Sequence, residues 1–192
     1  MQAIRTIINS YIVKSLLNQF LIFPKSISIH MKNLILIRHA KSSWDEPVSD
    51  KDRKLTEGGK NDAALVSLES RNLLIDKFVL FSSNARRAYE TATIFATNYS
   101  VPLNEIIFKE DLYTFDENQL EKVIKSLNKD LENVILFGHN AAITNFVNKF
   151  GDIFIENVPT SGFIWIKFDC QEWKLLKKGK IQKVIFPRDL KI

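Results

Sequence analysis

Three short, uninterrupted runs of apolar residues dominate the hydrophobic pattern of this chain: residues 34–37, 78–81 and 134–137. A continuous apolar run of this length is typical of a strand that is covered on both faces. Segments with helical spacing of apolar residues lie between the runs, so strands and helices alternate. This alternation predicts an α/β fold, namely a three-layer α/β/α sandwich around a mostly parallel central sheet.

Four segments after these strands are expected to be helices. The first follows Thr56 and runs to about residue 71, and the second follows Asn84. Both Thr56 and Asn84 are residue types that favour the N-cap position of a helix. The remaining expectations are helices over about residues 117–128 and 140–150, a polar loop over 38–54 and an extended stretch over 106–113.

The C-terminal part alternates apolar and polar residues over 163–168 and over 173–186, the latter divided at residues 178–180, which predicts strands joined by turns. Trp165, Phe168 and Trp173 lie among lysines, an arrangement that also occurs in nucleic-acid platforms. Alternation of this kind is the ordinary pattern of a half-buried strand, so we expect core positions and no nucleic-acid partner. Cys170 in this region is expected to be a buried structural thiol.

Residues 1–30 differ from the rest of the chain. They are apolar but interrupted by polar residues and by Pro24, so no stretch reaches the roughly 20 apolar residues of a membrane span. A secretory signal is disfavoured because no clean apolar region precedes a small-residue cleavage site. The strand pattern begins just after Met31. We therefore interpret 1–30 as an extension outside the fold or an upstream read-through, with an amphipathic surface helix over 2–22 as the alternative, and 31–192 as the domain.

Charge and cysteine content narrow the class of protein. The net charge is +5, but residues 1–30 hold three of those charges, so the rest of the chain is nearly balanced and favours no polyanionic partner. The single cysteine cannot form an internal disulfide, which is typical of a reducing compartment and predicts a cytoplasmic protein. A length of 192 residues suits one domain.

Arginine and histidine residues that could take part in a reaction follow the end of each apolar run. Arg38 and His39 follow the first run, Arg86 and Arg87 lie just after the second, and His139 follows the third. The carboxyl ends of parallel strands meet at one edge of a sheet, where such folds bind ligands. Guanidinium groups match phosphate oxygens, and imidazole can attack phosphorus, so this set favours phosphoryl transfer. It suits a metal poorly, because arginines would surround the cation, and no G-x-S-x-G elbow for acyl transfer is present.

These residues resemble the motifs of SixA-type phosphohistidine phosphatases, a branch of the histidine phosphatase (phosphoglycerate mutase-like) superfamily. The resemblance covers residues 31 to about 190. The matching segments are Arg-His-Ala-Lys-Ser-Ser-Trp (38–44), Leu-Thr-Glu-Gly-Gly (55–59), Ser-Asn-Ala-Arg-Arg-Ala with Thr91 (83–91), Phe-Gly-His-Asn (137–140) and Pro-Arg-Asp-Leu (187–190). It implies a phosphoglycerate mutase-like fold and a metal-independent phosphatase without a cofactor.

The resemblance also implies roles for the central residues. His39 would be the nucleophile, with its tautomer set by a partner at the other ring nitrogen. Arg38, Arg87 and a protonated His139 would contact the phosphoryl oxygens. Adjacent helical residues point about 100° apart, and the spacing from Ser83 selects Arg87 rather than Arg86 for the site.

Further residues near these motifs have alternative functions. Asn140 could instead cap the last helix, and the loop after His39 could only pack over the pocket. The SixA-type branch has no obvious proton donor. The candidates for substrate binding are Lys41, Ser42, Ser43 and Asn140, and those for proton donation are Glu110 and Asp111.

The sequence thus predicts a phosphatase that works through a covalent phosphohistidine. The absence of a clear acid favours phosphohistidine on a protein as substrate, because an alkoxide leaving group needs a proton donor. The alternatives are a small-molecule phosphomonoesterase of the same superfamily and a non-catalytic phosphate-binding adaptor.

Overall fold

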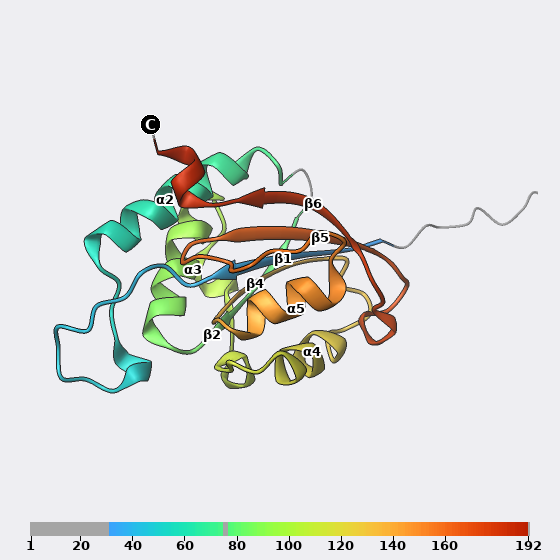
Figure 1. Cartoon of the computed structure of the whole chain (residues 1–192), viewed down its shortest axis with the longest axis horizontal. Helices are drawn as coiled ribbons and strands as arrows, with labels where there is room; N and C mark the ends of the chain where they lie inside the picture. Colours follow the sequence, from blue (N-terminus) through green and yellow to red (C-terminus); the bar gives the residue numbers. More distant parts are fainter. Residues whose placement is uncertain (1–30, 75–76, 192) are drawn as a thin grey trace, which may run out of the picture.

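A six-stranded sheet with the order β3-β2-β4-β1-β5-β6 forms the centre of the molecule. The computed structural model describes residues 31–74 and 77–191. The strands β1 to β4 pair in parallel, whereas β5 and β6 are antiparallel, so the expected mostly parallel sheet is confirmed (Figure 1). The strand bounds are β1 Met31–Arg38, β2 Val79–Ser83, β3 Ile107–Lys109, β4 Asn133–Gly138, β5 Phe163–Asp169 and β6 Lys180–Ile185.

Helices cover both faces of this sheet and complete the three layers (Figure 1). Leu34 and Leu36 of β1 pack into the cluster that contains α4 and α5, while Ile35 and Ile37 pack into the cluster on the α2 and α3 side. All four side chains are fully buried, which explains the uninterrupted apolar run. The helix bounds are α2 Glu57–Arg71, α3 Arg86–Asn98, α4 Glu117–Lys125 and α5 Ala142–Phe150.

Of the two predicted N-caps, Thr56 is confirmed and Asn84 is not. Thr56 caps α2, since its side-chain oxygen accepts a hydrogen bond from the backbone N–H of Gly59. The expectation for Asn84 is wrong, because α3 begins one residue later, with Ala85 at its N-cap. The Ser83 hydroxyl accepts the N–H of Ala85 instead, so the turn is stabilised by the preceding side chain.

One of the predicted C-terminal strands is absent. The strand predicted over 163–168 is β5, and the part of 173–186 after the division at 178–180 contains β6, but the part before it is wrong, because Trp173–Leu175 is a 3-10 helix. Trp173 is fully buried, and its indole N–H donates to the Leu131 carbonyl, which holds this segment against the core. Cys170 packs against the same core but is only partly buried.

Three other predicted boundaries also shift. The predicted helix over 117–128 ends at Lys125, and the one over 140–150 begins at Ala142. The stretch predicted to be extended over 106–113 contains β3 and then a 3-10 helix, Glu110–Leu112. This turn carries the buried Leu112 into the core.

The aromatic residues weighed as a nucleic-acid platform are part of the fold. Phe168 and Trp173 are buried. Trp165 is half-buried, packs edge-on against Phe78 and donates its indole N–H to Asn33. These contacts confirm the interpretation of this region as sheet and core.

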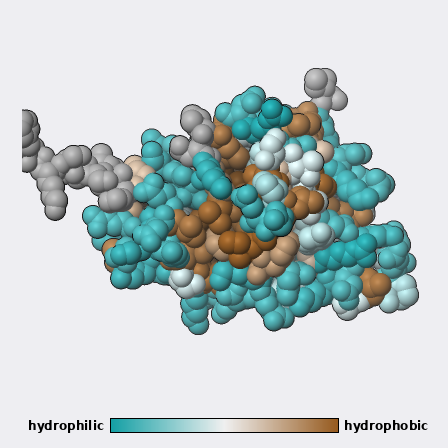
Figure 2. Space-filling view, turned by 180° about the vertical axis from the view of Figure 1, so that it is seen from behind, coloured by the Kyte–Doolittle hydropathy of each residue, from teal (hydrophilic) through white to brown (hydrophobic). Residues whose placement is uncertain are grey.

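The expectations for residues 1–30 lie outside the described residues. Within residues 31–74 and 77–191, no helix combines the length and the apolar character needed to traverse a bilayer. Figure 2 shows that hydrophilic residues cover much of the rear face, with hydrophobic residues gathered near its centre.

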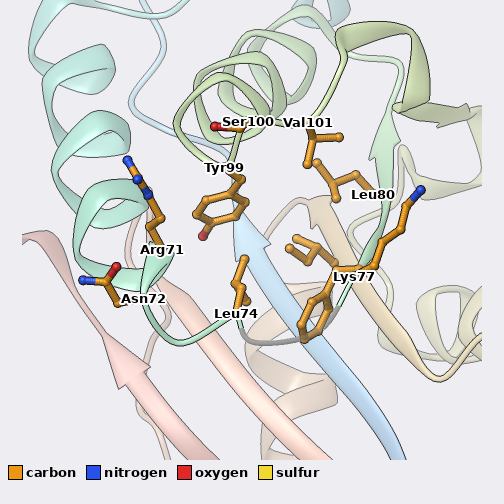
Figure 3. A pocket seen from close by; sticks show the side chains of 10 residues that line it. Arg71, Asn72, Leu74, Lys77, Leu80, Tyr99, Ser100 and Val101 are labelled. Atoms are coloured by element: carbon orange, nitrogen blue, oxygen red, sulfur yellow. The ribbon is translucent and has the colours of Figure 1, made fainter.

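A hollow of about 440 Å³ lies where α2 and α3 end and β2 begins (Figure 3). Leu74, Phe78, Leu80 and Val101 give it an apolar wall, and the Tyr99 hydroxyl shares a hydrogen bond with Ser70. It lies at the amino-terminal ends of the parallel strands, opposite the edge where the candidate chemistry was predicted. The hollow therefore does not contain the motifs.

Gly59 provides a test of how tightly α2 packs against the loop after His39. A Cβ added to Gly59 would lie 2.2 Å from the Lys41 carbonyl oxygen, whereas one added to Gly58 meets nothing within 4 Å. We expect Gly59→Ala to lower the free energy of unfolding by about 1–3 kcal/mol, and Gly58→Ala to raise it by at most about 1 kcal/mol. Urea unfolding measures both variants, and equal effects would show that the close approach is absent.

Candidate active site

The pairing of β1 with β4 brings both imidazoles to one edge of the sheet. Arg38, the last residue of β1, lies opposite Gly138, the last residue of β4. The backbone N–H of His39 then donates to the Gly138 carbonyl at 3.0 Å. The ring centroids of His39 and His139 are consequently 5.1 Å apart. The predicted gathering of the motifs at the strand ends is confirmed.

The His39 imidazole is held in one tautomer. Its Nδ1 lies 2.8 Å from the carbonyl oxygen of Ala40, so Nδ1–H donates there and the lone pair remains on Nε2. Burial lowers the pKa of His39 to about 3; the hydrogen bond to Ala40 opposes this shift, and the charge of Arg87 adds to it. The ring is therefore neutral near neutral pH, as an attacking imidazole must be.

The two adjacent arginines of the second motif point in different directions. Arg87 is 1% exposed, and its Nε donates to Nε2 of His39 at 3.1 Å. Arg86 lies at the surface and pairs with Glu90 at 2.8 Å. The predicted register is thus the one in the structure. Thr91 strengthens it, because its hydroxyl donates to the Arg87 carbonyl and accepts the N–H of Ala40.

Two buried polar atoms in this cluster have no partner within the described part of the chain: Nε of Arg38 and Nδ1 of His139. One other nitrogen of each side chain is engaged. Nη1 of Arg38 donates to the Val158 carbonyl, and Nε2 of His139 shares a hydrogen bond with Ser83. Buried polar atoms are rarely left unpaired in native proteins. An oxyanion that accepts from both would satisfy them.

His139 does not have the protonation state expected from its motif. Burial, together with the nearby His39 and Arg87, lowers its pKa to about 2. The ring centroids of Tyr113 and Phe115 lie 5.3 and 5.4 Å from the centroid of the imidazole, and both rings add to its burial. Contrary to the expectation of a protonated side chain, His139 is neutral and offers one N–H donor.

Asp50 belongs to this cluster, although the sequence analysis did not single it out. Its carboxylate accepts from Nη2 of Arg87 at 2.9 Å and from the Tyr113 hydroxyl at 2.6 Å. Its other oxygen accepts two hydrogen bonds from Arg53. Partial burial alone would raise the pKa of Asp50, but the hydrogen bonds of Tyr113 and Arg53 and the charge of Arg87 hold it well below its usual range.

The predicted substrate-binding residues occupy several environments. The Ser42 hydroxyl accepts from Arg53, which connects it to Asp50, and Lys41 is exposed. The Ser43 hydroxyl donates to Asp45 at the surface. The Oδ1 of Asn140 accepts from Thr144 in the first turn of α5, although the N-cap position itself is Ala141. Its Nδ2 donates to the Val158 carbonyl, which also accepts from Arg38, whereas Ser42 is the one of these four whose side chain bonds directly to an arginine of the cluster.

Neither candidate proton donor contacts the histidines. Glu110 pairs with Lys51 at 3.1 Å with its side chain largely exposed, and Asp111 is exposed. The 3-10 turn buries Leu112, and Tyr113 is the residue whose ring reaches His139. The turn therefore directs both carboxylates outward, which is the reverse of the expectation.

A metal site is likewise not assembled here. Within residues 31–74 and 77–191, no group of three or more His, Cys, Asp or Glu side chains is placed to hold a metal ion. The two histidines are instead accompanied by guanidinium groups.

The buried neutral histidines predict how stability depends on pH. An unfolded imidazole binds a proton below about pH 6.5, whereas both folded imidazoles stay neutral. The free energy of unfolding should therefore fall as the pH decreases from about 7 to about 5, by at most about 1.4 kcal/mol per pH unit for each histidine. Urea unfolding at both pH values measures it. A His39→Asn/His139→Asn variant with an undiminished decrease would contradict this assignment.

Comparison with known proteins agrees with this geometry. Residues 34–122 match the model of the histidine phosphatase superfamily (branch 1). No match is found among proteins of curated function.

Several solved structures share the fold. A putative phosphohistidine phosphatase SixA from Agrobacterium tumefaciens has 20% identity and a TM-score of 0.67, with 80% of this chain and 97% of that chain covered. A protein histidine phosphatase SixA complexed with tungstate has 18% identity and a TM-score of 0.71, with 83% and 99% covered.

A mycobacterial glucosyl-3-phosphoglycerate phosphatase is also similar, with 12% identity, a TM-score of 0.55 and coverage of 79% and 97%. These identities are low, so the likenesses establish the phosphoglycerate mutase-like fold alone. The sequence match over 34–122 covers slightly less than half of the chain and includes Arg38, His39 and Arg87. This part of the chain is similar to the histidine phosphatase superfamily, branch 1.

Proposed function

We propose that this phosphatase transfers a phosphoryl group to His39 and acts on phosphohistidine carried by a protein. The proposal rests on the geometry of the His39 imidazole. His39 is neutral, its Nδ1–H is fixed on the Ala40 carbonyl, and its Nε2 lone pair faces Arg87. A fixed lone pair beside a guanidinium is the arrangement that in-line attack on a phosphoryl group requires.

The proposed reaction has two steps. In the first, Nε2 of His39 forms a bond to phosphorus while the bond from phosphorus to the leaving nitrogen breaks, and the released imidazole takes a proton from water. In the second, water attacks phosphorus, the bond to Nε2 breaks, and inorganic phosphate leaves. The Nε–H of Arg87, which donates to the Nε2 lone pair in this structure, would move to a phosphoryl oxygen when the substrate binds.

The cationic groups of the site would stabilise the transferred phosphoryl group. In a loose transition state the negative charge is spread over three equatorial oxygens. Arg87 and the unpartnered Nε of Arg38 would donate to these oxygens, as would Nδ1–H of His139. Each such preorganised donor is typically worth about 3–4 kcal/mol in the transition state.

The carboxylates around the site support a phosphohistidine substrate. Glu110 and Asp111 face outward, and Asp50 is held ionised by Arg53, Arg87 and Tyr113, so it is poorly suited to donate a proton. An imidazole leaving group can be protonated by solvent, whereas an alkoxide depends on a positioned acid. Two of the similar structures are described as SixA phosphohistidine phosphatases, and this description agrees with the proposal.

The alternatives are a small-molecule phosphomonoesterase and a phosphate-binding adaptor. The similar mycobacterial glucosyl-3-phosphoglycerate phosphatase favours the first, since it shares the fold.

His39→Ala tests the nucleophile. The variant should lose all measurable turnover of a phosphohistidine protein, because no other described side chain offers a fixed lone pair beside Arg87. Wild-type protein quenched in acid-free denaturant after mixing with ³²P-labelled phosphohistidine protein should carry label on His39. The same assay with p-nitrophenyl phosphate and sugar phosphates separates the two phosphatase classes.

The controls for this experiment address the rival functions. Turnover should persist in EDTA, because arginines rather than a metal balance the phosphoryl charge. Binding of phosphate without any labelled His39 would identify an adaptor. Faster turnover of sugar phosphates than of phosphohistidine would identify the phosphomonoesterase.

The adjacent arginines form a matched pair for a second test. Arg87→Ala should lower kcat/KM by about 10²–10³, the usual loss for one preorganised donor. Arg86→Ala should change it less than about twofold, because Arg86 pairs with Glu90 at the surface. Arg87→Lys should recover only part of the loss, since a point charge cannot replace the planar guanidinium. Equal losses for Arg86→Ala and Arg87→Ala would contradict the assignment.

A further inference from the structure

Asp50 contacts Arg87 through both its side chain and its backbone. It begins a 3-10 turn, Asp50–Asp52, in the loop after His39. Its carboxylate accepts from Nη2 of Arg87 at 2.9 Å, and its backbone carbonyl accepts from Nη1 at 2.5 Å. The third nitrogen, Nε, donates to His39. Each nitrogen of this guanidinium therefore has a defined partner.

The Asp50 carboxylate is itself held in place from two other sides. Arg53 donates twice to Oδ1, at 3.0 and 2.8 Å, and the Tyr113 hydroxyl donates to Oδ2 at 2.6 Å. Arg53 is fixed in turn, because its guanidinium stacks 3.6 Å from the ring centroid of Trp44 and donates to Ser42. These contacts hold the Asp50 carboxylate in one position.

We propose that Asp50 is a positioning residue, which holds the Arg87 guanidinium beside Nε2 of His39, so that Nε–H can pass to a phosphoryl oxygen and the free N–H groups remain available to the other oxygens. A guanidinium has five N–H groups, and three are engaged within the protein. Two are therefore left, one on each Nη. This inference rests on the proposed function, because it assigns Asp50 to the same reaction.

The charge of the cluster fits this role. Arg38, Arg53 and Arg87 supply three positive charges, and Asp50 removes one, which leaves +2 opposite a phosphoryl dianion. Arg53 would otherwise repel Arg87, and Asp50 lies between them with one oxygen toward each. The carboxylate thus allows two guanidinium groups to remain close without displacing Arg87 from His39.

An alternative role for Asp50 predicts that its removal raises kcat/KM. If the Asp50 carboxylate merely occupied the place of a phosphoryl oxygen, substrate would have to displace it, and its removal would raise kcat/KM. The two hydrogen bonds from Arg53 and the one from Tyr113 anchor the carboxylate independently of Arg87, which favours the positioning role.

Kinetics of full-length Asp50 variants test the proposal. Asp50→Ala should lower kcat/KM by about 10- to 100-fold, because a small misplacement of a donor near the reacting atoms has an effect of that size. Asp50→Glu keeps the charge and should recover part of the loss. Asp52→Asn is the matched control, because Asp52 lies in the same turn but its carboxylate accepts from Ser49 and, among the described residues, from no group of the cluster, and it should leave the rate unchanged. A rate increase in Asp50→Ala would overturn the proposal.

A double-mutant cycle shows whether Asp50 acts through Arg87. Adding Asp50→Ala to the Arg87→Ala variant should cost less than about twofold, because the group that Asp50 positions is already absent. A merely structural role would lower activity by the same factor in both backgrounds, and that result would contradict the proposal. Circular dichroism and thermal melts confirm that each variant is folded.

A spectroscopic measurement separates this inference from the proposed function. In a ¹⁵N NMR spectrum, the Arg87 Nε–H signal should be protected from exchange in the wild type and in Asp52→Asn, and lost in Asp50→Ala. Failure of the wild type to hydrolyse any phosphorylated substrate would refute the proposed function without affecting this readout. An Arg87 signal that is unchanged in Asp50→Ala would refute the role of Asp50.

Discussion

The parallel pairing of β1 with β4 is the constraint on which the site depends. It sets Arg38 opposite Gly138, so the residue after each strand is a histidine at the same edge of the sheet. The next strand, β2, ends beside β4 at Ser83, whose hydroxyl meets His139 and supports the turn into α3. A slip of one residue in the β1–β4 register would move one imidazole relative to the other by about 3.3 Å and separate the two rings.

Burial and charge act together on the imidazoles at this edge. Both rings are enclosed by protein and face guanidinium groups, and each of these influences disfavours a charged imidazole. The result is a pair of neutral rings among permanent cations. Attraction for an anion therefore comes from the arginines, while the histidines supply a lone pair and a hydrogen-bond donor.

Much of the fold and the central residues could be predicted from the sequence, because those features have local signals. Buried strands appear as continuous apolar runs, and His39, Arg87 and His139 occur at fixed distances from strand ends. Helical geometry requires that only one of Arg86 and Arg87 faces the site, and the spacing from Ser83 in the motif that resembles the family selected Arg87.

The features that were missed depend on long-range contacts. Asp50 lies in a polar loop without periodicity, and its spacing from Arg53 suggests only a local ion pair. Its link to Arg87 spans 37 positions. Trp173 shows the same limitation, since the alternation around it predicts a strand, but burial of the indole and its hydrogen bond to Leu131 favour a turn. The protonation state of His139 likewise depends on burial that a motif does not report.

The two edge strands of the sheet, β3 and β6, have features that affect pairing with strands of other chains. The strand β3 has only three residues, and β6 presents the exposed side chains of Lys180 and Lys183. Short strands and lysines at a sheet edge both disfavour hydrogen bonding to a strand of another chain. The sheet is therefore protected against edge-to-edge aggregation at both ends, even though its central strands are among the most apolar segments of the sequence.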